Sequence, residues 1–449
     1  MNRNKLNVGF ITTVSGRWPR ETPQKRMENY GSFLKEKLPE VNLITFDTLI
    51  DSPKRIDNAI DTLKQQSVDL VIMLYGAFTG DDVCTGIAEN LKVPLILWAP
   101  REPELGGGRL LSNALVALTM NNASMHRLGH TCYPVYGNMD EQEAVSKVLS
   151  IVKAYSVVKK MRHTVLGLFG YRPTAFYNSA FDEGLIRRTF GIRMEETDLK
   201  TVFDEMEKTD PEELEKDKQL VANTFHFAEN LPQEYKDNHS KLYLALKKLV
   251  EQEGYDYCAI KCWPEMGNLK TTPCAVLGRL ADANINIACE GDVDATLAIV
   301  AQNCITGEAN FITDMIDLHE EGNYLTFWHC GNAAPSLHHK EYPTKMGDHP
   351  LAGQGTAFYT TLKEGPVTIS RFCNIDGVYK LFMVRGTASK TDLYTPGCMV
   401  NVVPDAPVKN IMDAILKNGV PHHYSIVWED VTDIMKMVAE ILGIEVIQY

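Results

Sequence analysis

Two carboxylates in the second half of the chain each follow a short apolar run that is typical of a β-strand. Glu290 comes after residues 285–289, and Asp314 comes after residues 311–313. In parallel α/β sheets ligands bind beyond the carboxyl ends of the strands, so we expect both side chains at such ends. Two carboxylates on neighbouring loops can bind a hard divalent cation such as Mn²⁺ or Mg²⁺, or can divide the acid and base steps of a reaction. Position alone leaves open that each is an ordinary surface acid.

Histidines in the last third of the chain extend this candidate site. His329 lies in the segment Trp328-His329-Cys330-Gly331-Asn332, and His422 and His423 are adjacent just before a predicted helix. Imidazole binds Mn²⁺, Fe²⁺, Co²⁺ and Zn²⁺. Adjacent side chains on a strand or loop point in different directions, so at most one histidine of the pair is expected to bind a metal. An isolated histidine is more often a hydrogen-bonded polar residue than a ligand.

The elements that must position these residues alternate between strand-like and helix-like segments over two thirds of the chain. In the first round we expect strands at 6–12, 41–46, 68–75 and 94–99, and helices at 23–37, 53–66, after 81, and from about 110 and 140. In the second round we expect strands at 164–169, 257–261 and 286–289, and helices at 179–188, 241–253, 273–283 and 294–305. This alternation predicts parallel sheets that are covered by helices on both faces.

The remainder of the chain has a different pattern, with short runs rich in β-branched and aromatic residues between Gly, Pro and Asp turns. These runs lie at 324–328, 355–362, 367–374, 379–385 and 398–403, before helices at 408–418 and 431–442 and a strand at 444–447. They predict an antiparallel sheet or barrel. The fold class is therefore expected to be α/β, with two Rossmann-like parallel-sheet domains, residues 1–162 and 163–318. A β-rich, barrel-like domain, residues 319–449, is expected to close the site.

Composition and charge exclude several classes of function. The chain has 449 residues and a net charge of −13 without a basic block, which argues against nucleic acid or an anionic membrane as a partner. No apolar run approaches the roughly 20 residues that span a bilayer, and no signal-peptide pattern follows Met1. The ten cysteines include no CxxC pair, so we expect reduced thiols and a cytoplasmic protein. Nucleotide chemistry is disfavoured because the predicted strand turns carry neither a P-loop nor a GxGxxG motif.

Four segments taken together resemble the metal-site segments of L-fucose and L-arabinose isomerases. They are Cys289-Glu290-Gly291-Asp292, the acid at Asp314, His329-Cys330-Gly331 and Pro421-His422-His423. Their order and spacing agree over the last third, and the predicted domain plan fits the whole chain. The resemblance implies that Glu290 and Asp314 bind a divalent metal, Mn²⁺ by first choice, and also transfer protons, and that His423 is the imidazole ligand. His329 resembles a ligand of the arabinose branch and is assigned here to substrate binding.

The resemblance also indicates which residues line the substrate and how the chain assembles. Arg17 is similar to an arginine in a turn of fucose isomerases that reaches a neighbouring subunit's site. Family members build sites between subunits, which implies a homo-oligomer, a hexamer by first choice, with sites at subunit interfaces. The predicted substrate-binding residues are Arg17, Arg20, Tyr75, Phe78, Arg172, Trp263 and His329.

The implied function is a metal-dependent aldose–ketose isomerase, an intramolecular oxidoreductase of carbohydrate metabolism. It would act on an open-chain sugar through a 1,2-enediol, with Glu290 and Asp314 as base and acid in an order that the sequence leaves open. The cation would lower the energy of the enediolate by roughly several kcal/mol.

Several sugars remain open as the substrate. They are an L-fucose or arabinose-type sugar and an anionic 6-sulfo sugar such as sulfoquinovose, which would give 6-deoxy-6-sulfofructose. The sulfo sugar is favoured because short members with this layout include sulfoquinovose isomerases. Its anionic tail would need cations, which Arg17, Arg20, Arg172 and Lys261 could supply from predicted strand ends.

Two other classes of function remain as alternatives. A non-catalytic sugar-binding protein could use the same pair of βα domains, but periplasmic proteins of this kind need an export signal and the β-rich third domain would be unexplained. A metal-dependent aldolase could use the same carboxylates and histidine. Cleavage of a carbon–carbon bond would separate the aldolase from the isomerase.

Overall fold

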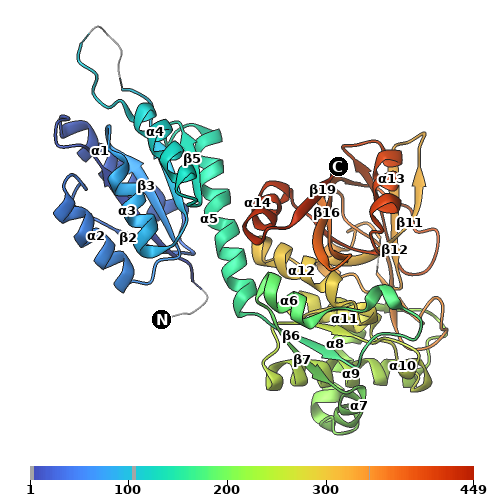
Figure 1. Ribbon diagram of the computed structural model, residues 1–449. Coiled ribbons are helices and arrows are strands. Elements are labelled where there is room, and N and C mark those ends of the chain that lie inside the picture. Colours follow the sequence, from blue (N-terminus) through green and yellow to red (C-terminus); the bar gives the residue numbers. More distant parts are fainter. Residues whose placement is uncertain (1–4, 104–107, 343) are drawn as a thin grey trace. The chain divides into compact units, whose positions relative to one another are not determined.

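The computed structural model describes residues 5–103, 108–342 and 344–449, and it divides into two compact units. Unit 1 is Met1–Lys160 and unit 2 is Met161–Tyr449 (Figure 1). The second and third predicted domains, 163–318 and 319–449, lie together within unit 2, and the boundary between them stays a prediction.

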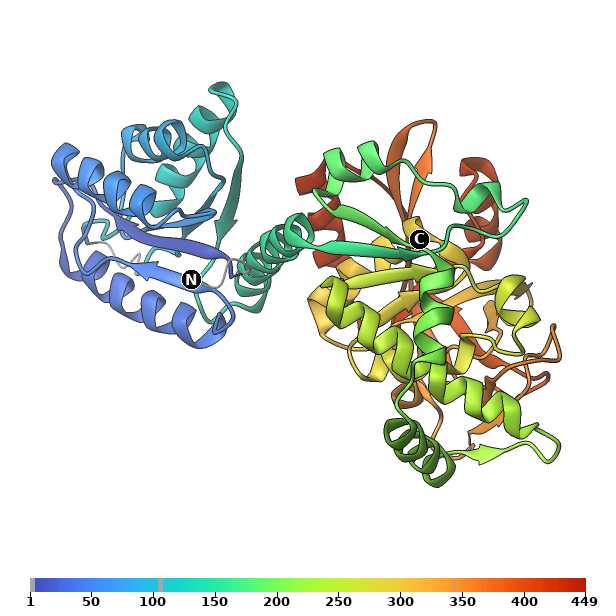
Figure 2. The same cartoon turned by 90° about the horizontal axis from the view of Figure 1, so that it is seen from below.

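Unit 1 is a five-stranded parallel sheet with helices on both faces (Figure 2). The strand order is β2-β1-β3-β4-β5, and the packed side chains place α2, α3 and α4 on one face and α1 on the other. All six residues of β3 are buried, as expected for a central parallel strand. The elements of unit 1 are β1 (Asn7–Thr13), α1 (Glu21–Lys37), β2 (Asn42–Thr45), α2 (Pro53–Gln65), β3 (Leu70–Tyr75), α3 (Asp81–Leu91), β4 (Leu95–Ala99), α4 (Ala114–Arg127) and β5 (Cys132–Tyr136), with α5 (Gln142–His163) leading into unit 2.

Unit 2 begins with a four-stranded parallel sheet in the order β10-β9-β6-β7. Helices α7, α9 and α11 cover one face, and α12 packs against β9 and β10. The elements of this part are β6 (Val165–Phe169), η1 (Tyr177–Ser179), α6 (Glu183–Phe190), β7 (Arg193–Thr197), α7 (Leu199–Glu207), α8 (Pro211–Thr224), β8 (His226–Phe227), α9 (Gln233–Glu253), β9 (Tyr257–Ile260), α10 (Glu265–Asn268), α11 (Cys274–Asp282), β10 (Asn286–Ala288), η2 (Cys289–Gly291) and α12 (Val293–Thr306).

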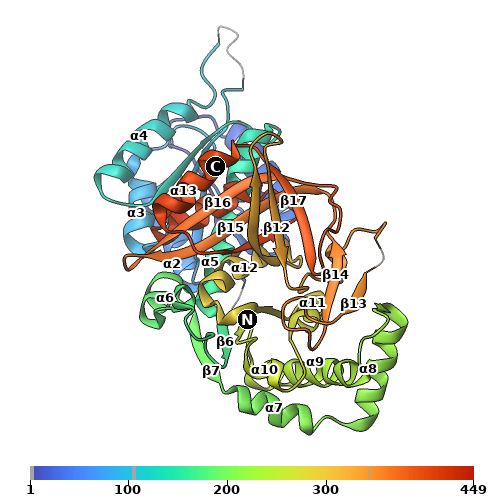
Figure 3. The ribbon, with the colours of Figure 1, turned by 90° about the vertical axis from the view of Figure 1, so that its right-hand side faces the viewer.

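The C-terminal part of unit 2 contains a closed antiparallel barrel of six strands (Figure 3). The strands follow the order β16-β15-β18-β11-β12-β17, and β17 pairs with β16 to close the ring. The prediction of an α/β fold with parallel sheets and a barrel is thereby confirmed. The elements are β11 (Phe311–His319), β12 (Tyr324–His329), η3 (Pro335–Leu337), β13 (Lys345–Gly347), β14 (Ala357–Thr361), β15 (Gly365–Ile375), β16 (Val378–Ser389), β17 (Cys398–Pro404), α13 (Val408–Asn418), β18 (His423–Val427), α14 (Thr432–Leu442) and β19 (Glu445–Gln448).

Helix α12 joins the parallel sheet to the barrel. Twelve of its fourteen residues are buried, because β9 and β10 pack on one side and β15 and β18 on the other. Gln302, at the barrel side, donates to the carbonyl oxygens of Thr368 and Ser425 at 3.1 and 3.3 Å. A helix buried on both sides fixes the barrel strands relative to the turn that precedes it, which carries Glu290.

Two strands that carry candidate site residues differ from the prediction. Asp314 lies inside β11 and not at a strand end, because β11 continues through polar residues to His319. His423 begins β18, whereas no strand was predicted for this segment, which was expected only to precede a helix. Polar residues in both strands hide the apolar signal. The edge strands β5 and β7 were also not predicted; β7 has mostly half-exposed or exposed side chains, and β5 contains Pro134, which an edge strand tolerates.

Within the described residues, the structure has no helix that is both long and apolar enough to cross a membrane.

The contact between α11 and the segment after β12 can be tested at Gly278. A Cβ atom there would lie 2.4 Å from the carbonyl oxygen of Ala333. We expect Gly278→Ala to lower the free energy of unfolding by about 1–3 kcal/mol through overpacking. At Gly86, inside α3, an added Cβ atom would have only ordinary contacts at 3.9 and 4.0 Å. Gly86→Ala should therefore raise the free energy of unfolding by about 0.5–1 kcal/mol. Urea denaturation measures both, and equal stability of Gly278→Ala and the wild type would contradict this packing.

Candidate active site

Glu290 lies directly beyond the carboxyl end of β10, as predicted. It occupies the short turn η2 with φ 59° and ψ 20°, a left-handed conformation that is uncommon for a residue other than glycine. Gly291 follows with φ 60°, and a Cβ atom there would lie only 1.9 Å from the carbonyl oxygen of Tyr171. The turn is therefore held tightly against the segment that follows β6, and this contact fixes where the Glu290 carboxylate lies.

Two barrel strands bring Asp314 and His423 to the Glu290 carboxylate. Asp314 on β11 and His423 on β18 are direct partners in the antiparallel register. The Nε2 atom of His423 lies 3.5 Å from Oε2 of Glu290 and 3.8 Å from Oδ1 of Asp314. Both predicted carboxylate ligands therefore approach Nε2 of His423 within unit 2. His329, at the end of β12, has its ring centroid 5.5 Å from that of His423.

The two adjacent histidines do not point in different directions, contrary to the prediction. Their ring centroids lie 4.0 Å apart with an angle of 34° between the planes. His422 Nε2 lies 3.3 Å from Oε2 of Glu290, so both imidazoles reach the same carboxylate. This arrangement arises because His422 precedes β18 and does not follow the alternation of a strand. The other ring nitrogen of His422 is 2.9 Å from Nδ2 of Asn178.

A buried chain of charges holds His423 in place. The Nδ1 atom of His423 and Oδ2 of Asp292 are 2.9 Å apart, and Arg371 donates to both Asp292 oxygens at 2.9 and 3.1 Å. Arg371 also donates to the carbonyl oxygen of His423 at 2.8 Å. The side chains of all three residues are fully buried. With Nδ1 bonded to a carboxylate, the Nε2 atom faces Glu290 and Asp314, an arrangement that is common for metal-binding histidines.

The local charges determine the direction of each pKa shift. Burial opposes ionisation of Asp292, but Arg371 and His423 outweigh it and lower the pKa of Asp292 below its usual value. Burial also opposes protonation of His423, but Asp292, Asp314 and Glu290 outweigh it and raise the pKa of His423. Burial raises the pKa of Asp314, and burial lowers the pKa of His329 well below its usual value. The cluster therefore favours a positive charge beside His423 Nε2, carried by a proton or by a cation.

Three buried atoms at this point have no hydrogen-bond partner among the described residues. They are Oδ1 of Asp314, Nε2 of His423 and Nδ1 of His329. Buried polar atoms are almost always paired, so three adjacent unpaired atoms need a further explanation. Two sets of atoms within 4.8 Å of one another could hold an ion, one from Glu290, His422 and His423 and one from Asp314, His329 and His423. Carboxylate oxygen and neutral imidazole nitrogen suit Mn²⁺ and related divalent ions, so the donor types of each set fit the expected metal. His423 belongs to both sets, whereas Glu290 and Asp314 belong to different ones.

A cavity of about 370 Å³ opens beside these residues. Glu290, His329 and the predicted substrate residue Trp263 all line it. No lysine or arginine is among the described residues that line the cavity. The other lining residues are Cys262, Pro264, Gly267, Asn268, Thr272, Pro273, Cys274, Cys289, Cys330, His349, Leu351, Ala352 and Gln354.

Arg172 lies in the segment after β6 that packs on the Glu290 turn. A Cβ atom on Gly291 would be 3.3 Å from Cα of Arg172. The guanidinium lies 5.2 Å from the ring centroids of both Tyr171 and Tyr177, and its Nε atom is buried without a hydrogen-bond partner in the described chain. The backbone of Arg172 thus lies near the Glu290 turn, and its guanidinium carries no ion pair with the described residues. Lys261 is paired with Glu265 at 2.5 Å.

The remaining predicted substrate residues belong to unit 1. Arg17 is exposed, and Arg20 forms an ion pair with Asp51. Tyr75 is fully buried and its hydroxyl donates to Asn121 at 2.9 Å, which is the environment of a core residue. Phe78 is half-buried, with its ring centroid 6.4 Å from that of Trp18. The assignment of these four residues to substrate binding stays a prediction.

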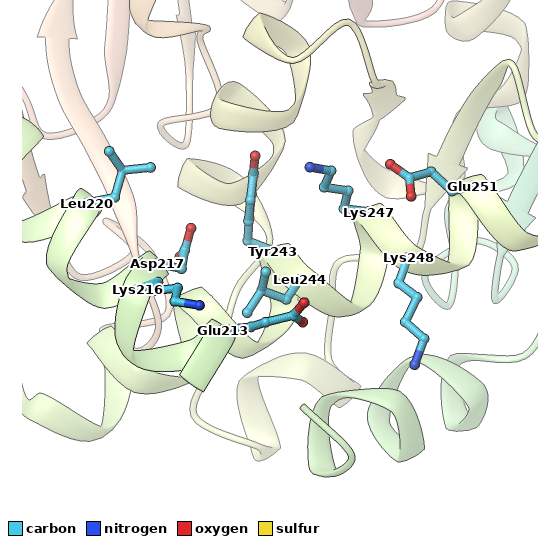
Figure 4. A pocket seen from close by; sticks show the side chains of 9 residues that line it. All are labelled: Glu213, Lys216, Asp217, Leu220, Tyr243, Leu244, Lys247, Lys248 and Glu251. Atoms are coloured by element: carbon cyan, nitrogen blue, oxygen red, sulfur yellow. The ribbon is translucent and has the colours of Figure 1, made fainter. Parts of the chain in front are cut away.

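A second hollow of about 500 Å³ lies on α8 and α9 (Figure 4). Its lining combines three lysines with three acids, so it presents no charge of one sign. Asp217 in its wall forms a buried ion pair with Arg279 at 2.6 Å, and the guanidinium lies 3.9 Å from the Tyr243 ring centroid. These contacts hold the helices together and do not make a second catalytic site.

Comparison with known proteins identifies the relatives of this chain. It is 28% identical over 405 residues to the sulfoquinovose isomerase of Alkalicoccus urumqiensis, a match that covers 89% of this chain and 90% of the relative. It is 26% identical over 409 residues to the sulfoquinovose isomerase of Priestia megaterium, covering 90% of each. The chain is related to sugar isomerases. The predicted resemblance to isomerases of the fucose and arabinose type, and the predicted class of an aldose–ketose isomerase, are confirmed.

No family model matches the chain. A periplasmic solute-binding protein from Actinobacillus succinogenes with bound D-allose aligns at 12% identity and a TM-score of 0.19, covering 68% of this chain and 92% of that protein. Such a low score does not support a shared fold.

Four residues of this candidate site were not predicted from the sequence. Asp292 was part of a quoted segment but received no role, and His422 was passed over in favour of its neighbour. Arg371 carries a signal that could have been used, because an arginine inside the apolar run 367–374 must be paired when it is buried. His349, in the cavity wall, has no such signal, because it lies in a polar loop.

The pairing of Arg371 with Asp292 predicts a large loss of stability on truncation. We expect Arg371→Met to lower the free energy of unfolding by about 3–5 kcal/mol, because it removes the guanidinium that pairs with both oxygens of a fully buried carboxylate. Arg385, on the neighbouring strand β16, pairs with Asp405 and Asp430 at the surface. Arg385→Met should therefore change the free energy of unfolding by at most about 1 kcal/mol. Chemical denaturation compares the two variants, and similar small losses would refute the account of the buried pair.

Proposed function

We propose that the isomerase site lies in unit 2 and that Glu290, Asp314 and His423 bind a divalent cation, Mn²⁺ by first choice. The observation that carries this proposal is the approach of both carboxylates to Nε2 of His423, with Oδ1 of Asp314 and Nε2 of His423 both buried and unpaired among the described residues. His329 and His422 border the same point, since each is near enough to share a ligand set with His423. Asp292 and Arg371 support the site by fixing the ring of His423.

The residues of the site suit a proton transfer between neighbouring carbons of an open-chain sugar. The cation, when bound, polarises the sugar oxygens and stabilises the charge of the enediolate. One of the two carboxylates, Glu290 or Asp314, removes the proton from C2 and delivers it to C1. The other transfers the hydroxyl proton. The cavity beside Glu290, walled by Trp263 and His329, holds the rest of the sugar and limits access of water.

We propose sulfoquinovose, converted to 6-deoxy-6-sulfofructose, as the substrate. Two arguments support it. The named relatives, which match about nine tenths of the chain, are sulfoquinovose isomerases, and Arg172, whose Cα atom lies near the Glu290 turn, carries no ion pair with the described residues. A planar guanidinium suits a sulfonate because it donates two parallel hydrogen bonds. The cavity lining itself supplies no cation, which leaves sulfonate recognition to residues such as Arg172 outside it. Homo-oligomerisation and a cytoplasmic location stay predictions.

The reaction is tested with metal-stripped protein and a panel of aldoses that includes sulfoquinovose, L-fucose and L-arabinose. We expect ketose formation from sulfoquinovose only when Mn²⁺ is restored. Glu290→Gln and Asp314→Asn should lower kcat by at least about a hundredfold, because each removes a group that transfers a proton. Asp317→Asn, on the exposed side of the same strand β11, should leave kcat unchanged.

Three outcomes would overturn the proposed function. Turnover that persists in Glu290→Gln would remove the carboxylate from the mechanism. Carbon–carbon cleavage products would indicate an aldolase. Sugar binding without turnover by the metal-loaded wild type would indicate a binding protein.

The support of His423 by Asp292 predicts weaker metal binding when that carboxylate is neutralised. Asp292→Asn keeps an oxygen for the backbone amide of Ala295, which Asp292 caps at 2.9 Å, but loses the charge that orients His423. We expect the Kd for Mn²⁺ to rise roughly 10–100-fold. Isothermal titration calorimetry measures this change, with Asp317→Asn as the control. An unchanged Kd in a folded Asp292→Asn protein would show that Asp292 does not support the metal site.

A further inference from the structure

His349 is a histidine of the cavity wall that the mechanism does not use. It lies in the loop between β13 and β14 and lines the cavity together with Glu290 and His329. Leu351 and Ala352 from the same loop complete this part of the wall. The role of such a ring depends on the hydrogen-bond partner of each of its two nitrogens.

The loop folds around one nitrogen of the His349 ring. The backbone N–H groups of Leu351 and Ala352 donate to Nδ1 at 3.2 and 3.1 Å. The backbone of His349 is also tied to the loop, since its N–H donates to Gln354 and its carbonyl oxygen accepts from Gly353. Because both partners of Nδ1 are donors, Nδ1 must carry a lone pair, and the proton of the neutral ring is therefore on Nε2.

The ends of the loop hold this ring in position. The amide of Thr356 donates to Oγ1 of Thr272 at 3.0 Å, and the same hydroxyl donates to the carbonyl oxygen of Thr356 at 3.0 Å. Gly355 has φ +68°, and a Cβ atom there would lie 2.3 Å from the backbone nitrogen of Thr272. Tyr359 donates to Oδ1 of Asp348 at 2.9 Å at the other end. The ring is thus held in place before any ligand binds.

The Nε2–H group of His349 has no hydrogen-bond acceptor among the described residues. Both hydrogen bonds that the ring accepts from the loop backbone end at Nδ1. Burial lowers the pKa of His349 below its usual value, which keeps the ring neutral and Nε2 a donor. A fixed donor without a partner in a sugar-sized cavity is suited to an oxygen of the ligand.

We infer that His349 is a sugar-binding residue whose Nε2–H donates a hydrogen bond to an oxygen of the sugar in the cavity. This inference rests on the proposed function, because it assigns the cavity to the sugar. It gives the isomerase a donor whose direction is set by the loop and not by the metal cluster. A site built around such a donor rejects sugars that lack the matching oxygen, so His349 contributes to specificity.

Two substitutions separate this role from a purely structural one. In His349→Asn the side-chain oxygen takes the place of Nδ1 and accepts the two loop amides, but no donor reaches the position of Nε2. In His349→Gln the amide nitrogen reaches that position, but the acceptor for the loop amides is lost. His339→Asn is the matched control, because the amide of Glu341 donates to its Nδ1 at 3.3 Å and His339 does not line the cavity.

The test measures binding and kinetics with the Mn²⁺-loaded full chain. The probes are sulfoquinovose for turnover and its open-chain alditol, which cannot isomerise, for calorimetric Kd. We expect His349→Asn to raise the alditol Kd and the sugar KM about tenfold, with kcat changed by less than about threefold. His349→Gln should stay within about threefold of the wild type, and His339→Asn should be unchanged.

Each other outcome decides against the inference or against the proposed function. Wild-type Kd and KM in His349→Asn, or a larger loss in His349→Gln than in His349→Asn, would overturn the role of His349 as a sugar donor. A wild type that binds the alditol but isomerises no sugar would overturn the proposed function, while the Kd of His349→Asn still decides the role of His349. A wild type that binds neither probe would overturn both.

Discussion

The buried contact of Arg371 with Asp292 is the constraint on which the rest of the site depends. Both side chains are fully buried, and each would be strongly unfavourable there without the other. The same carboxylate holds Nδ1 of His423, so the direction of the imidazole is determined by an ion pair that lies away from the cavity.

This arrangement also explains why unit 2 needs both a parallel sheet and a barrel. The turn after β10 supplies Glu290 and Asp292, and the barrel strands supply Asp314, His329, Arg371 and His423. Asp292 caps α12, whose buried length packs against both parts. Asp292 thus ends a turn, starts the helix that joins the two layers, and orients the imidazole of His423 from the second layer. A shift between sheet and barrel would separate the carboxylate from the imidazole.

The sequence predicted the types and order of most elements and the three converging residues, for physical reasons that differ from case to case. Long amphipathic helices and buried strands such as β3 have strong periodic signals. Glu290 was placed at a strand end because an apolar run stops just before it. Asp314 was likewise expected at a strand end, and the family resemblance gave it and His423 their roles as ligands, while their places inside β11 and β18 were not predicted. Polar side chains that point into a site interrupt the very pattern that identifies a strand.

The roles of Asp292, Arg371 and His349 could not be predicted, because each depends on which side chains meet in three dimensions. Arg371 and Asp292 are 79 residues apart, and nothing in their local patterns pairs them. The lone pair of His349 is fixed by two amides of its own loop, which only the loop conformation reveals. Left-handed backbone at Glu290 is similarly invisible in a sequence that offers glycine only at the next position.

An anomalous difference map from crystals soaked in Mn²⁺ tests the central claim most directly. The account predicts one strong peak per chain bounded by an oxygen of Glu290, Oδ1 of Asp314 and Nε2 of His423, with Nδ1 of His423 still bonded to Asp292. A map without a peak at this position, or with the ion held by residues other than these three, would contradict it.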